Sequence, residues 1–592
     1  MANRPFKPRK RRASTGERRG DSPRGKRNTG RRPERREDPA AGWGEPRRDT
    51  RSDAGERRER DDRPREQRSQ GRDDRRGPRR DDRRGPRRDD RRGPRRDDRR
   101  GPRRDDRRGP RRDDRRGPRR DDRRDERRSV MPTYWSDRGE AVMDGEPPVW
   151  VWGGIPGERA EVRTRKSGQH RQYVVFERTE QPSPHRVEPP CDRFTSCGGC
   201  PWMHLDVIGQ ADARVSRVQE VFDAERIPVQ VSPLVASPDG LQDFRHVSKL
   251  LAGVSDQGNY RLGAPARFSR RIVSIPECNV LTPELRAVTL AAAHAMIDLD
   301  VRPFHEGRGL LRYLQARQSR ETGKILLTIV AGYRARILDR FAEAIMAAVP
   351  QVSGAHLHIN ERDDNNIFDR DEEGLVRTQV IFGDAHLEER VGDALVRVGP
   401  SDFFQTNPGV GELLVQHVLD SAKLDKGVPV VDLYCGVGGT TLNAAKRTEW
   451  ALGVEVNSVA IQHARAAASS QVIPAEFLAG SVDEVLESQH KRLSGMRPVV
   501  LVNPARRGLE EGVGQAIRGL NPRRLVYTSC SPRNLARDLA GFVAEGWTVE
   551  SVVPFDMFPN TQHVEVVATL VPADAGEGVT RRAPRRRTVK RR

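Results

Sequence analysis

The chain has 592 residues, of which 34% are apolar and 33% are charged, and its formal net charge is +23. The charge is unevenly distributed. Residues 1–130 contain 53 Lys and Arg against 29 Asp and Glu, whereas residues 131–578 contain 48 against 57. No apolar stretch is long enough to span a membrane, so the composition excludes a membrane protein and predicts several domains between two basic ends.

The N-terminal region, residues 1–130, is built largely from a repeat. DDRRGPRR occurs six times between Asp73 and Arg120, with almost no aliphatic side chains around it. Such a segment has little to bury, so we predict that residues 1–130, and the basic tail 576–592, are disordered. The arginines could bind RNA phosphates without sequence preference, or the segment could be a solubilising tail whose charge is partly neutralised by its own aspartates.

The first residues, MANRPFKPRKRR, contain no apolar leader segment, and we expect a cytoplasmic protein. Six cysteines in a long chain of this kind indicate metal binding or catalysis rather than disulfides.

Residues 131–183 alternate apolar and polar side chains between glycine-containing turns, as in VWVWGGIPGERAEVRTRK. This alternation predicts a small β-barrel. The segment PGERAEVRTRK resembles the TRAM domain, an OB-like RNA-binding barrel attached to RNA-modifying enzymes.

Residues 184–398 follow as a mixed α+β region that contains four of the cysteines: Cys191, Cys197, Cys200 and Cys278. Four thiolates can hold a zinc ion or a [4Fe–4S] cluster. A zinc ribbon would show two CxxC pairs and only one is present, which favours the iron–sulfur cluster but leaves zinc open.

Residues 399–575 have the pattern of a mostly parallel, doubly wound α/β sheet of Rossmann-like type. VPVVDLYCGVGGTTLNAA is a strand, a glycine turn and a helix, and Glu455 ends the next strand. Gly436 and Gly438 would let a ligand approach the turn, and Glu455 would accept hydrogen bonds from ribose hydroxyls. The full G-x-G-x-x-G pattern is missing, which favours an adenosyl ligand without pyrophosphate over NAD.

Five motifs in order, SDFFQTNP, DLYCGVGG, NPARRG, YTSCSPRNLARDL and DMFPNTQHVEVV, resemble the RNA uracil-5-methyltransferase family. The resemblance covers residues 131–572 and implies a class I methyltransferase domain that uses S-adenosylmethionine. With the four cysteines and the TRAM-like segment, it points to the iron–sulfur branch that includes 23S ribosomal RNA enzymes. We therefore expect an RNA partner, ribosomal RNA before transfer RNA, with no DNA or membrane partner, and a monomer.

The resemblance also assigns roles. Uracil C5 becomes nucleophilic only after a thiolate adds to C6, and Cys530 resembles that nucleophile. Glu565 resembles the base that removes the C5 proton. The implied cofactor contacts are Gln405, Tyr434, Glu455 and Asn503, whereas Cys435 is expected only to pack.

Four positions depart from the family. Asn503 and Ala505 stand in NPAR where the family usually has DPPR, Ser531 stands in SCSP where the family usually has SCNP, and Ser481 stands where an acidic residue is common. An alternative hypothesis is therefore an RNA-binding assembly factor on a weakened methyltransferase scaffold. Because Cys530 and Glu565 are both present, we favour an active enzyme.

Overall fold

The computed structural model describes residues 127–573, apart from residues 256, 268, 270, 306, 363, 365 and 373. All of these residues belong to one unit of the chain, Asp49–Arg592. The disorder predicted for residues 1–126 and for 576–592 lies outside the described residues. Among the helices of the described part, none has the length and apolar character needed to cross a membrane.

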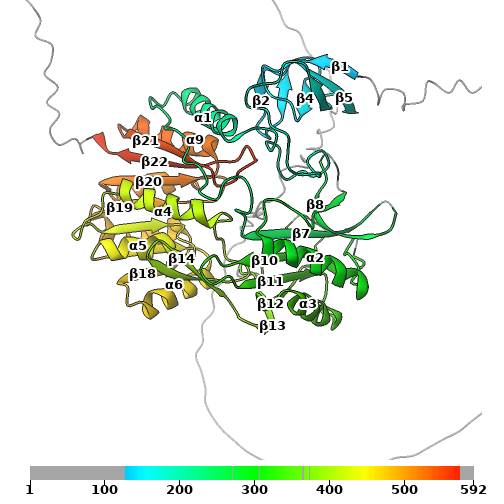
Figure 1. The fold of residues 1–592 in the computed structure, drawn as a ribbon. Helices are drawn as coiled ribbons and strands as arrows, with labels where there is room; N and C mark the ends of the chain where they lie inside the picture. Colours follow the sequence, from blue (N-terminus) through cyan, green and yellow to red (C-terminus); the bar gives the residue numbers. More distant parts are fainter. Residues whose placement is uncertain are drawn as a thin grey trace, which may run out of the picture. The chain divides into compact units, whose positions relative to one another are not determined.

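A six-stranded sheet begins the described chain (Figure 1). Its strands are β1 (Arg127–Val130), β2 (Tyr134–Trp135), β3 (Ala141–Met143), β4 (Val149–Trp152), β5 (Ala160–Ser167) and β6 (Gln172–Thr179). They pair in the order β1-β5-β6-β4-β3-β2, and only β4 and β6 are parallel. Alternate valines, such as Val151, Val162 and Val174, form its core. The sheet agrees with the predicted alternation, and the TRAM assignment stays a prediction.

The predicted start of this sheet needs correction. Strand β1 begins at Arg127, inside the segment predicted to be disordered, and pairs along its length with β5. Val130 is buried, and Arg127 forms an ion pair of 3.1 Å with Glu177. Because backbone pairing and an opposite charge accommodate the arginines, their composition does not prevent a strand.

A seven-stranded mixed sheet follows along the chain, in the order β13-β12-β11-β10-β7-β8-β9. Its elements are β7 (Val247–Val254), β8 (Tyr260–Pro265), β9 (Ile272–Ser274), α2 (Pro283–Asp298), β10 (Leu311–Gln318), β11 (Ile325–Ala331), α3 (Ile337–Ala348), β12 (Val352–Ile359) and β13 (Gln379–Gly383). Helices α2 and α3 pack on one face through a shared apolar cluster that includes Leu285, Phe341 and Ile345.

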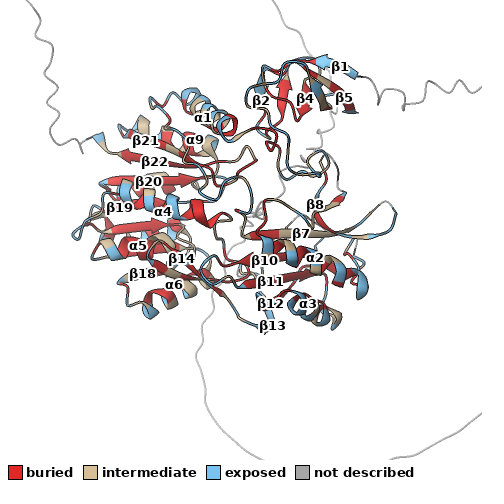
Figure 2. Ribbon diagram, in the orientation of Figure 1, coloured by how far each residue is buried: buried red, intermediate tan, exposed pale blue. Residues whose placement is uncertain are grey.

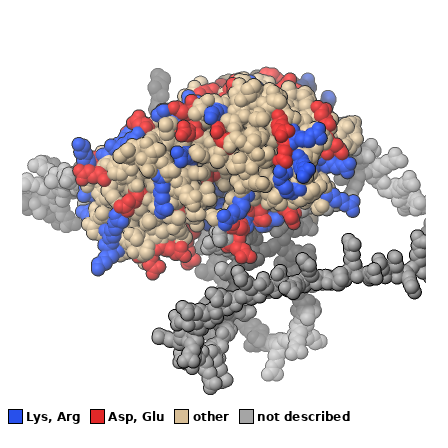
Figure 3. Space-filling model, turned by 90° about the horizontal axis from the view of Figure 1, so that it is seen from below, with Lys and Arg blue, Asp and Glu red and all other residues tan. Residues whose placement is uncertain are grey.

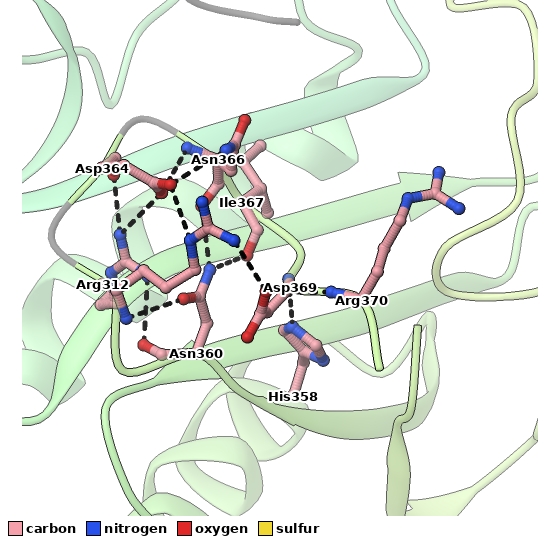
Figure 4. A network of polar contacts seen from close by, with 9 residues as sticks. Arg312, His358, Asn360, Asp364, Asn366, Ile367, Asp369 and Arg370 are labelled. Carbon is pink, nitrogen blue, oxygen red and sulfur yellow. Dashed lines mark hydrogen bonds and ion pairs between the residues drawn. The ribbon is translucent and has the colours of Figure 1, made fainter. Parts of the chain in front are cut away.

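The segment between β12 and β13 is held by polar contacts (Figure 4). Arg312 donates to the carbonyl oxygens of Asn360 and Asp364, at 3.1 and 2.7 Å. The backbone N–H of Asp369 donates to His358 Nε2 at 2.8 Å. In Figure 4 the side chain of Arg370 extends away from this network. These contacts hold the described part of the loop in one conformation, which its composition alone does not predict.

The C-terminal sheet has the order β18-β17-β16-β19-β20-β22-β21, parallel except at β22. Its strands are β16 (Val430–Leu433), β17 (Ala451–Glu455), β18 (Ala475–Ala479), β19 (Val499–Val502), β20 (Arg524–Ser529), β21 (Thr548–Phe555) and β22 (Glu565–Val571). The helices are α4 (Pro408–Ser421), α5 (Gly439–Arg447), α6 (Ser458–Ser470), α7 (Val482–Ser494), α8 (Val513–Gly519) and α9 (Pro532–Ala544). One apolar cluster includes residues of α4, α5 and α6, and a second those of α7, α8 and α9. The predicted doubly wound α/β fold is confirmed, and its central strands are buried (Figure 2).

Two elements outside residues 399–575 also belong to this core. Helix α1 (Val207–Ala224) contributes Val218 and Phe222 to the cluster on the α9 side. Strands β14 (Leu387–Val391) and β15 (Ala394–Val398) form a hairpin that contributes Val396 to the other cluster. The boundary predicted at residue 399 is therefore too late, because alternate apolar residues in the hairpin pack against this domain.

Both charge signs are interspersed on the face drawn in Figure 3.

Candidate active site

The predicted catalytic residues meet at one edge of the C-terminal sheet. Strands β16, β17, β19 and β20 are parallel, so their carboxyl ends share that edge. Strand β22 runs in the opposite direction, and Ser529 pairs with Val566. This register brings Cys530, which follows β20, next to Glu565, which begins β22. Residues 35 positions apart in the sequence thereby become neighbours because one strand is antiparallel.

Cys530 lies between a carboxyl group and a guanidinium group. Burial and then the Glu565 carboxylate raise the pKa of its thiol to about 11, while Arg506, which hydrogen-bonds to the thiol, opposes the rise. Arg506 lies in the loop after β19, and its carbonyl oxygen accepts a hydrogen bond of 2.6 Å from Asn534 of α9. The loop and the helix together hold a cation against the thiol.

Glu565 is a buried carboxyl group, only 4% exposed. Burial raises its pKa to about 8, and the charge of Arg506 opposes this rise. Its Oε2 atom has no hydrogen-bond partner within the described residues. Its neighbour His563 has its pKa lowered to about 4 by burial and then by Arg506. Near neutral pH the imidazole is therefore uncharged, and Glu565 can accept or hold a proton.

The glycine turn after β16 presents open space to a ligand. Gly436 has φ +55°, and a Cβ atom there would meet no atom within 4 Å. Gly438 has φ +83°, and a Cβ atom there would lie 2.7 Å from the Phe477 ring. Glu455 Oε2 accepts from the Gly436 N–H at 3.3 Å, and Oε1 accepts from the Asn457 N–H at 2.9 Å. The Glu455 carboxylate is thus hydrogen-bonded to the turn, and its predicted contact with ribose hydroxyls stays a prediction.

Tyr434 lies directly before this turn with φ +63°, an uncommon conformation for a residue other than glycine. Its hydroxyl donates a hydrogen bond to the carboxylate of Glu510, in the loop after β19. Burial and this hydrogen bond raise the pKa of Tyr434. Arg507 donates to the other oxygen of Glu510 at 3.1 Å. The contact ties the predicted cofactor turn to the loop that carries Arg506.

The two remaining predicted cofactor contacts differ in position. Asn503 directly follows β19, it is exposed, and its backbone N–H donates to Leu433 O at 3.3 Å. It therefore lies at the same edge as the turn. Gln405 precedes α4 and lines a separate cavity with His246 and Arg317. Within the described part of the chain, no hydrogen bond joins Gln405 to the glycine turn.

The four cysteines predicted to bind metal come together from two segments. Cys191, Cys200 and Cys278 pack against one small apolar cluster that includes Met203 and Phe244. Burial and then the other three cysteines raise the pKa of Cys200. Over residues 127–573, with the gaps stated above, no group of three or more His, Cys, Asp or Glu side chains is arranged to hold a metal ion. The metal assignment stays a prediction.

Comparison with known proteins decides the family. The model of the tRNA (Uracil-5-)-methyltransferase family matches residues 379–571. An uncharacterized RNA methyltransferase of Nostoc sp. is 31% identical over 453 residues, which cover 75% of this chain and 95% of the relative. Another from Synechocystis sp. is 32% identical, with 72% and 91% covered. The chain belongs to the RNA uracil-5-methyltransferase family. It is an S-adenosylmethionine-dependent RNA methyltransferase.

A solved structure has the same fold as this methyltransferase. The Pyrococcus abyssi tRNA (uracil-54, C5)-methyltransferase, in complex with S-adenosyl-L-homocysteine, superimposes with a TM-score of 0.59 at 24% identity. The match covers 75% of this chain and all of that chain. The likeness supports the methyltransferase fold, and the roles of the glycine turn and Glu455 stay predictions.

Two charged residues beside the predicted site residues were not themselves predicted. Arg506 touches the Cys530 thiol, and its place in the NPARRG motif was the signal that could have identified it. Arg370 lies near enough to Glu455 to lower the pKa of that carboxyl group, against the larger effect of burial. It comes from the loop in Figure 4, where the sequence gives no motif.

Proposed function

We propose that this protein methylates C5 of a uridine in RNA, with Cys530 as the nucleophile and Glu565 as the base. The observation that carries the proposal is the register of β20 and β22, which puts thiol and carboxyl side by side at the cofactor edge. Arg506 contacts the thiol, and its charge opposes the rise in pKa that burial causes in Cys530 and Glu565.

The reaction balances with these residues. The Cys530 thiolate forms a bond to C6 of uracil, and the electron pair of the C5–C6 double bond moves into an enolate centred on C5 and O4. S-adenosylmethionine supplies a methyl group on its sulfonium, which C5 takes, leaving S-adenosylhomocysteine. Glu565 then removes the C5 proton, the double bond re-forms, and the Cys530–C6 bond breaks to return the thiolate.

The protonation states fit these roles. Arg506 stabilises the thiolate of Cys530, whose pKa burial would otherwise raise further. Glu565, with its pKa raised to about 8 by burial, is a stronger base once ionised than an exposed carboxylate. His563 is held neutral beside it and does not compete as a cation.

The substrate that we propose first is ribosomal RNA, because the four-cysteine cluster and the six-stranded sheet resemble the branch of the family with 23S ribosomal RNA enzymes. Transfer RNA is the second candidate, because the matching family model is described as tRNA (Uracil-5-)-methyltransferase.

Mapping 5-methyluridine in RNA from cells with and without the protein tests both candidates. A 23S ribosomal RNA site that loses its methyl group, and regains it with wild-type protein but not with Cys530→Ala, supports the first. Loss confined to transfer RNA supports the second. Full methylation of both in the deleted strain contradicts the proposed function.

We also propose that Cys191, Cys197, Cys200 and Cys278 hold an iron–sulfur cluster. Four free cysteines are the type of donor that such a cluster takes, and two of them, Cys200 and Cys278, lie close enough to the buried Arg245 to act on its charge. Burial raises the pKa of Cys197, Cys200 and Cys278, and a bound cationic centre would favour the thiolates that burial disfavours. When bound, a [4Fe–4S] cluster would cross-link the segment 191–200 to Cys278.

Anaerobic purification of the whole protein tests the cluster. A brown protein with iron and sulfide, lost in Cys278→Ser, supports it. A colourless protein that contains zinc contradicts it.

A further inference from the structure

Two arginines from different helices contact one exposed carboxylate. Arg533, in the first turn of α9 and three residues after Cys530, contacts Asp137 with an Nη2–Oδ2 distance of 2.9 Å. Arg217, on α1, lies 3.9 Å from the other oxygen of Asp137. Asp137 belongs to the turn between β2 and β3, so three separate parts of the chain meet at this point.

The contact between Asp137 and Arg533 adds little to stability. Both side chains are more than 70% exposed. Exposed ion pairs typically contribute between about 0 and 1 kcal/mol. A carboxylate held this weakly can be displaced by a competing anion.

Arg217 is a more deeply placed donor. Its guanidinium lies 5.9 Å from the centre of the Trp202 ring, and its buried Nη1 has no hydrogen-bond partner in the described part of the chain. Burial lowers its pKa, and Asp137 opposes that fall. A phosphate that replaces Asp137 would meet the Nη2 atom of this guanidinium, which Asp137 approaches only to 3.9 Å.

The surrounding charges favour an anion. Helix α9 has no acidic residue in its first turn and no side-chain cap at Ser531. The charges of Arg506 and Arg217 both lower the pKa of His563, so both lie near this residue. The acidic groups facing Arg217 besides Asp137 are Glu220 and Glu140. Glu140 is buried and already bonded to Ser136 at 2.8 Å and to Arg267 at 3.5 Å.

We infer that Arg217 and Arg533 bind a backbone phosphate of the RNA strand whose uridine enters the site, and that Asp137 holds this place in the free protein. A carboxylate and a phosphate present similar oxygens to a guanidinium, so each can replace the other. A base that reaches Cys530 leaves its own backbone outside the site, and Arg533 is an exposed residue in the first turn of the helix that follows Cys530. The inference rests on the proposed function, because it assumes an RNA strand at Cys530.

Binding of a fluorescently labelled oligouridylate to the full-length protein tests the inference, with the variants Arg217→Gln, Arg533→Gln and Asp137→Asn. Each arginine variant should weaken binding about three- to fivefold and reduce the slope of log affinity against log salt by about one. Asp137→Asn should tighten binding by a similar factor. Arg492→Gln is the matched control, because Arg492 forms an exposed ion pair with Glu476 elsewhere in the domain. This variant should change the affinity and its salt slope only by the general effect of losing one charge.

The sign of the change in oligouridylate affinity in Asp137→Asn shows whether Asp137 competes with phosphate or only holds its own turn. If Asp137 only anchors its turn, the variant binds RNA as wild type does or more weakly, and the inference is overturned. In the double variant Asp137→Asn with Arg533→Gln, the gain from Asp137→Asn should disappear. A wild type that transfers no methyl group to RNA contradicts the proposed function, whereas unchanged oligouridylate binding by both arginine variants contradicts the phosphate site alone.

Discussion

The buried carboxyl group of Glu565 should make the protein less stable as the pH rises. Its pKa is raised from 4.5 to about 8, chiefly by burial. The folded protein therefore holds a proton that the unfolded chain releases, and the stabilisation it gives is complete below pH 4.5 and lost as the pH rises through 8. Glu565→Gln keeps the shape and removes the titration.

The magnitude follows from the shift. One pKa unit corresponds to about 1.4 kcal/mol, so wild type should lose about 3 kcal/mol between pH 6 and pH 9 through this group as an upper limit. Glu565→Gln should escape that loss and should also abolish methyl transfer. Thermal unfolding of wild type and variant at both pH values measures the difference.

The expected sign is specific. The melting temperature of Glu565→Gln minus that of wild type should be larger at pH 9 than at pH 6. An equal difference at both values, or a larger gain at pH 6, would show that Glu565 is not a buried group of raised pKa, and the assignment of this carboxyl as a strong base would fail with it.

Three further results are expected. Cys530→Ser should retain S-adenosylmethionine binding, measured by calorimetry, and lose methyl transfer by about three orders of magnitude; transfer at the wild-type rate would refute the nucleophile. Arg506→Gln should lower transfer about tenfold at neutral pH and move the rise of the rate to higher pH, because the thiol loses its hydrogen bond and a neighbouring positive charge; an unshifted pH profile would contradict this. Cys278→Ser should remove iron from anaerobically purified protein while Cys435→Ser, in the glycine turn, should not, and equal iron in both would exclude the four-cysteine site.

The sequence predicts the methyltransferase core well, because strand, glycine turn and carboxylate follow one another at short range. Glu455 ends the strand after the glycine turn as predicted, and it accepts a hydrogen bond from Gly436. Cys530 and Glu565 were paired only through the family resemblance, because the sequence around them does not reveal that β22 lies antiparallel to β20. Arg370 could not be predicted at all, because its approach to Glu455 depends on long-range contacts of the loop in Figure 4.

Domain limits were less predictable for a related reason. Periodicity identifies a strand or a helix but does not say which sheet it covers. Val218 and Phe222 give α1 an apolar stripe, and only the folded chain shows that this stripe packs on the C-terminal sheet. At the start of the first sheet, Arg127 looks like part of the charged repeat until its pairing with Arg163 of β5 is seen.

The placement of α1 has a consequence for how the polypeptide is made. This helix leaves the ribosome long before the strands that cover Val218 and Phe222 have been translated, so its apolar stripe must wait for the last part of the chain. Conversely, a fragment that starts at β14 would expose the sheet surface that α1 covers. We expect such a fragment to aggregate, and expect co-expression with a segment that carries α1 to restore its solubility.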